Sequence, residues 1–70
     1  MKAIIASYKP GDYDNTRKET MTKDLLAYTQ WIMRAGQRGY TAIQDTMTGT
    51  IYVIHPEDDS RNAFEVKFDF

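Results

Sequence analysis

The chain contains no cysteine and only one histidine, His55. Disulfides are therefore excluded, and a zinc site is nearly excluded because it needs several thiolate or imidazole ligands. No apolar run approaches the ~20 residues that cross a bilayer, and residues 1–8 lack the long apolar core of a signal peptide. We expect an intracellular, soluble protein of the cytoplasm, with no cofactor, no metal and no membrane partner.

An excess of charge of either sign is also missing. Nine basic and ten acidic residues leave a formal net charge of −1. Neutralising phosphates supplies most of the affinity of nucleic-acid-binding domains, so a nucleic-acid partner is less expected, although a local basic patch stays open. The hydrophobic fraction of 41% and the aromatic fraction of 13% argue against disorder. We predict one small domain over residues 1–70, with a thin stability margin.

Four segments have the patterns of β-strands. Residues 2–8 are apolar on both alternating faces, which is typical of a central strand. Residues 40–45 and 50–55 are separated by a polar loop, in which Gly49 should take a positive φ angle. Residues 63–70 alternate strictly, and one face of that strand should meet a helix. That face carries Phe64, Val66, Phe68 and Phe70.

One amphipathic helix is expected to end at about Ala35. Thr16 and Glu19 have the spacing of a capping box, but Thr20 or Thr22 are alternative caps, so the start is open by several residues. Gly36 or Gly39 would end the helix in a left-handed conformation. At about 100° per residue, a single stripe faces the core. This stripe consists of Met21, Leu25, Tyr28, Ile32 and Ala35.

These elements predict an α+β fold, a two-layer β-α-β-β-β arrangement with one amphipathic helix packed on a four-stranded, mostly antiparallel sheet. A right-handed crossover from residues 2–8 through the helix to residues 40–45 should place the helix on one face. The last three strands should form an antiparallel meander.

A single helix covers only one face of such a sheet, which leaves apolar side chains in surplus. These side chains either wrap the margins of a small core or form contact sites. The free edge of the last strand and the far face of the sheet are candidates for homodimer contacts. The predicted partner-binding residues are Leu26, Trp31 and Met33 on the helix and Tyr52 and Ile54 on the sheet.

The segment Gly36-Gln37-Arg38-Gly39 resembles the backbone-clamping GxxG loop of KH nucleic-acid-binding domains. The resemblance implies that Ile43 follows in a helix, that Gly36, Arg38 and Gly39 grip a single strand, and that Tyr40 stacks on a base. The alternative is structural: one glycine caps the helix and the other forms a turn before the next strand.

Two other clusters have a weaker chemical signal. The run Asp12-Tyr13-Asp14-Asn15 opens like an EF-hand loop, but the required later glycine and glutamate are missing, so we interpret it as a turn. His55 stands close to Glu57, Asp58 and Asp59, which allows a small enzyme with a histidine base. The alternative is a histidine at a strand end, followed by a solvated acidic loop.

The leading hypothesis is a non-catalytic protein-binding accessory or inhibitor module that acts on a larger protein. Small, cysteine-free chains without catalytic motifs are typical of phage-encoded host-takeover proteins, a similarity of style that no motif here supports. Single-stranded nucleic-acid binding through Gly36, Arg38, Gly39 and Tyr40 is the first alternative. An enzyme that uses His55 is the second.

Overall fold

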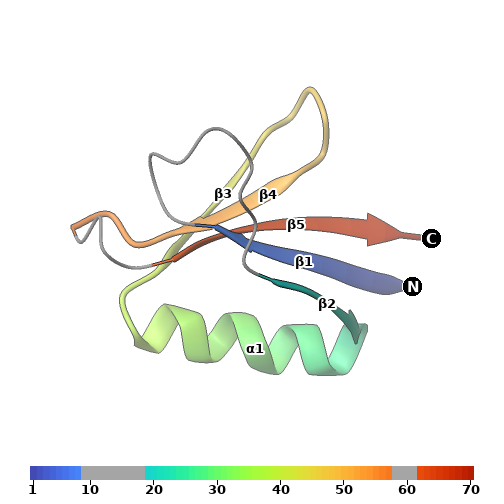
Figure 1. Cartoon of the computed structure of the whole chain (residues 1–70), viewed down its shortest axis with the longest axis horizontal. Helices are drawn as coiled ribbons and strands as arrows, with labels where there is room; N and C mark the ends of the chain where they lie inside the picture. The colour runs from blue at the N-terminus through green and yellow to red at the C-terminus, as the bar shows by residue number, and fades with distance from the viewer. Residues whose placement is uncertain (9–18, 58–61) are drawn as a thin grey trace.

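The computed structural model describes residues 1–8, 19–57 and 62–70. In these residues one helix, α1 (Leu25–Gln37), covers one face of a five-stranded sheet (Figure 1). The strands are β1 (Lys2–Tyr8), β2 (Glu19–Asp24), β3 (Thr41–Gln44), β4 (Ile51–Ile54) and β5 (Ala63–Asp69). The predicted α+β class is confirmed, but the predicted four strands are one too few.

The sheet order is β2-β1-β5-β4-β3, and every neighbouring pair is antiparallel. The last three strands form the predicted meander, and β1 is an inner strand, as its two apolar faces indicated. The predicted crossover from the first strand is wrong, because β1 leads to its antiparallel neighbour β2. Instead, α1 carries the chain across the sheet from the edge strand β2 to the opposite edge strand β3.

The C-terminal strand β5 is paired on both sides, with β1 and with β4. The prediction that its free edge could pair with a second copy is therefore wrong. The reason is topological: β5, the last strand of the meander, lies between β4 and β1, so both of its edges are paired. This placement puts Val66 opposite both Ile5 and Ile51, in the middle of the sheet.

The additional strand β2 is formed by residues that we expected to begin the helix. Thr20 and Thr22 are β-branched and favour extended backbone, and between them Met21 lies opposite Ile5 and packs on the core. The helix begins only at Leu25, with Asp24 as its N-cap. Glu19, Thr20 and Thr22 are therefore strand residues rather than caps. Thr16 lies outside the described residues.

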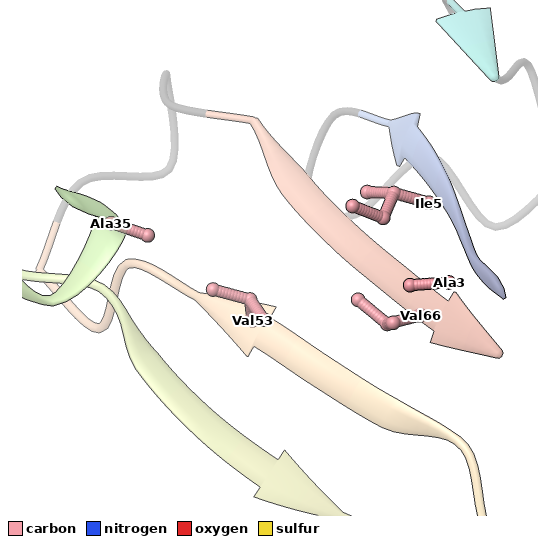
Figure 2. Packing of buried hydrophobic residues seen from close by; sticks show 5 residues of the cluster. All are labelled: Ala3, Ile5, Ala35, Val53 and Val66. Atoms are coloured by element: carbon pink, nitrogen blue, oxygen red, sulfur yellow. The ribbon is translucent and has the colours of Figure 1, made fainter. Parts of the chain in front are cut away.

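The core gathers side chains from β1, β4, β5 and the C-terminal half of α1 (Figure 2). Its buried members are Ala3, Ile5, Ala35, Val53 and Val66. Aromatic rings close its margin in edge-to-face pairs, with ring centroids 5.2 Å apart for Tyr28 and Phe68 and 5.1 Å apart for Trp31 and Phe64. The phenylalanine face of β5 thus meets the helix as predicted, except that Phe70 lies beyond the strand end and is 96% exposed.

Candidate functional site

The side of α1 that faces away from the sheet carries large apolar residues. Tyr28, Trp31, Ile32 and Ala35 turn inward and pack in or against the core. At about 100° per residue, Leu26 and Met33 point in the opposite direction. Leu26 is 70% exposed and Met33 is 62% exposed. We call Leu26, Gln30, Met33 and Gln37 the outer face of α1.

The outer face also lacks charge. Between Leu25 and Gln37 the sequence holds no acidic residue, and its single cation is Arg34. Exposed helix faces in small soluble domains usually carry many charged side chains. Here glutamines and apolar side chains meet water instead, so covering this face removes apolar surface from water at little cost in charge desolvation.

Leu25 corrects the predicted core stripe. It is exposed rather than buried, although it lies one turn before the inward-facing Tyr28. The reason is Trp31, which the sequence placed among the predicted partner-binding residues of the helix and not among its core residues. Because Trp31 packs inward against Phe64, the buried stripe is centred between Trp31 and Ile32, and Leu25 falls outside it.

Trp31 lies at the margin of the core rather than on the outer face. Its ring is half-buried and stacks on Tyr28 at a centroid distance of 6.1 Å. Burial raises the pKa of the Tyr28 hydroxyl above its usual value. Trp31 also borders a hollow of about 200 Å³ beneath the C-terminal end of α1. This α1–β5 hollow is lined by Trp31, Arg34, Ala35, Arg38, Tyr40 and Phe64.

The sheet-side candidates lie on the opposite side of the molecule. Val53 is buried in the core beneath α1, so its neighbours Tyr52 and Ile54 point to the far face, where both are half-buried. Tyr52 lies opposite Ile43 of the edge strand β3, and Ile43 is 54% exposed. The predicted partner-binding residues therefore do not form one site. Leu26 and Met33 lie on one apolar surface and Tyr52 and Ile54 on another, whereas Trp31 packs against the core.

The alternative nucleic-acid set lies together at the turn between α1 and β3. Gly36 is still helical, and Gly39 has a φ angle of +93°. Ile43 follows in a strand and not in a helix, so the element order that the KH resemblance implied is wrong. Arg38 and Tyr40 nevertheless line the same hollow as Arg34. The GxxG resemblance did not include Arg34, because this residue precedes the loop, yet Arg34 lines the hollow together with Arg38.

His55 is used structurally. Its Nδ1 accepts a hydrogen bond of 3.4 Å from the backbone N–H of Glu57, and its ring packs edge-to-face on Tyr40 at 5.4 Å. Asp58 and Asp59 of the predicted acidic cluster, like the run Asp12–Asn15, lie outside the described residues. Within the described residues, no group of three potential metal-ligating side chains is found.

No protein-family model, no curated protein and no solved structure matches the chain. In the part of the chain that the structure describes, no helix is long and apolar enough to span a membrane.

Proposed function

We propose that this chain is a non-catalytic protein-binding module, accessory or inhibitory, that binds a larger protein through the outer face of α1. One observation carries the proposal. Leu26 and Met33 are exposed on a helix face without acidic residues, although the core is closed by other side chains. Several other large apolar residues are also exposed, but Leu26 and Met33 lie together on one face of a helix. Such a cluster on a small domain is typical of a contact surface.

The spacing of these residues supports a helix laid into a groove. Leu26, Gln30, Met33 and Gln37 follow the i, i+4, i+7, i+11 pattern by which one helix face reads a partner's groove. Full burial of a leucine or methionine contributes about 1.5–3 kcal/mol each, enough to make both residues hot spots. The glutamines beside them can donate and accept hydrogen bonds at the rim of the contact.

The test is site-specific photo-crosslinking in cells of the source organism. A photo-reactive amino acid at Gln30, between the two anchors, should give one discrete adduct with a larger protein, because a bound partner covers this position. The matched control places the same group at Met47, which is 93% exposed on the turn between β3 and β4. Met47 is apolar and accessible, but the turn between β3 and β4 lies away from α1 (Figure 1), so this position should give no such adduct.

Affinity for the purified partner provides the quantitative comparison. The double variant L26S/M33S should bind at least about 30-fold more weakly, as expected when a hot spot is removed. The variant M47S should bind like the wild type, and circular dichroism should show that all variants are folded. Unchanged affinity of L26S/M33S would contradict the proposal. A crosslinked adduct of twice the chain's own mass would show that the outer face of α1 binds a second copy of the chain, which would contradict a larger protein partner.

A further inference from the structure

The α1–β5 hollow combines two features that proteins use to bind acidic groups beside apolar ones. Its walls are the rings of Trp31, Tyr40 and Phe64, and Ala35 closes it on the helix side. Arg34 and Arg38 line the same hollow, and none of the described residues that line it is acidic. Planar guanidinium groups match the geometry of a carboxylate and bind it through two parallel hydrogen bonds.

Both arginines are available for a ligand. Across the described residues, neither side chain takes part in an ion pair or a hydrogen bond. The sequence from Leu25 to Tyr40 contains these two cations and no aspartate or glutamate. The segment thus carries two positive charges and no negative side chain of its own, which favours an acidic partner.

The helix C-terminus does not cancel this attraction. A C-terminal pole corresponds to about half a negative charge, against two full positive charges on the arginines. The last carbonyl groups are also occupied, since Arg38 N–H donates to the Arg34 oxygen at 3.2 Å and Tyr40 N–H donates to the Ala35 oxygen at 3.1 Å. The two arginine charges therefore outweigh the negative pole of the helix at this site.

The hollow and the outer face of α1 are neighbours at Arg34. Arg34 lines the hollow and also borders a shallow depression with Gln30, Met33 and Gln37. A partner bound to Leu26 and Met33 could therefore also contact Arg34 and extend into the hollow. We propose that the hollow takes an acidic peptide segment of the protein partner, with one large apolar side chain against its aromatic walls and neighbouring carboxylates on Arg34 and Arg38. This proposal rests on the proposed function and names the chemistry of the partner.

A peptide fits better than a single-stranded nucleic acid. Binding a nucleic-acid backbone needs a row of cations, and this site has two. Base stacking also needs a free ring face. Tyr40 packs on His55 at 5.4 Å and on Phe64 at 5.7 Å, and Trp31 stacks on Tyr28, so these rings already contact one another.

The experiment is selection of a random peptide library on the full chain, followed by titration of the selected peptides. Trp31 is the only tryptophan in the chain and lines the hollow, so its fluorescence reports binding at the site directly. We expect enrichment of peptides with aspartate or glutamate next to a large apolar residue. The variants R34Q and R38Q should each weaken binding at least about tenfold, as expected for loss of a hydrogen bond to a charged group.

The control variant K2Q removes the same charge from an exposed lysine at the far end of β1, and it should bind like the wild type. Selected peptides without acidic residues, unchanged binding by R34Q and R38Q, or no selected peptide at all would each overturn this inference. Crosslinking at Gln30 tests the proposed protein partner independently of the peptide experiment. A failure of the acidic-peptide proposal is therefore distinguishable from a failure of the proposed function. Binding of a fluorescein-labelled single-stranded DNA that needs both arginines, without acidic-peptide binding, would assign the hollow to nucleic acid and overturn the peptide proposal.

Discussion

At the scale of single residues, the two glycines at the end of α1 have opposite roles. Gly39 has a φ angle of +93°, in the left-handed region, and a Cβ atom there would lie 3.1 Å from Nε2 of His55. Gly36 is helical, and a Cβ atom at this position would meet nothing within 4 Å. The turn that leads the chain into β3 therefore depends on Gly39, whereas Gly36 only adds conformational freedom to the unfolded chain.

Alanine at these two positions should change stability in opposite directions. G39A should lower the free energy of unfolding by about 1–2 kcal/mol, because an L-residue is strained in the left-handed region. G36A should raise it by about 0.5–1 kcal/mol, since alanine loses less backbone entropy in a helix. Urea unfolding followed by Trp31 fluorescence measures both. Equal effects of the two variants would contradict the assigned roles.

At the scale of elements, the boundary between β2 and α1 is set by Asp24. Its Oδ1 accepts a hydrogen bond of 2.7 Å from the backbone N–H of Ala27, which satisfies one free donor of the first helical turn. The same residue ends β2 opposite Lys2. One side chain thus ends a strand and begins a helix without an intervening loop.

Removal of this cap should weaken the domain moderately. D24A should lower the free energy of unfolding by about 1 kcal/mol, because the first turn loses its side-chain acceptor. D24N keeps an acceptor oxygen at the same place and should stay within a few tenths of a kcal/mol of the wild type. Thermal unfolding monitored by circular dichroism at 222 nm compares the two variants. A loss in D24N as large as that in D24A would assign the effect to charge rather than to capping.

At the scale of the whole molecule, stability depends on a small core. The cluster of five buried residues holds three large side chains, those of Ile5, Val53 and Val66. A domain of this length has a free energy of unfolding of only about 4–10 kcal/mol. Each methylene group in the centre of the sheet therefore contributes a large share.

Two neighbouring isoleucines on opposite faces of β1 make a matched test. Ile5 is fully buried beneath the helix, and Ile4 is partly exposed on the far face. I5V should lower the free energy of unfolding by about 0.5–1.5 kcal/mol through lost contacts and a small cavity. I4V should change it by less than about 0.5 kcal/mol. Urea unfolding provides both values, and a larger loss in I4V would show that the far face of the sheet is covered in solution.

Local patterns predicted much of this fold from the sequence. The strict alternation of residues 63–69 predicted β5 and the side of it that meets the helix. The two apolar faces of residues 2–8 predicted an inner strand, and Gly49 has the expected positive φ angle of 75°. On the helix, the exposure of Leu26 and Met33 follows from the seven-residue spacing that places both on one line.

Other features were decided only by contacts between distant residues. Residues 19–24 form a strand because Met21 pairs with Ile5 of the neighbouring strand, and no local sequence pattern predicts this pairing. The place of β5 between β1 and β4 removed the predicted free edge, and Trp31 turned the buried side of the helix away from Leu25. The hollow with Arg34 and Arg38 exists only where α1 ends over Phe64 of β5. Sequence periodicity predicts which face of a helix or strand each residue lies on. Which faces pack against each other is decided by the whole fold, because the free energy of burial depends on the apolar area that each contact removes from water.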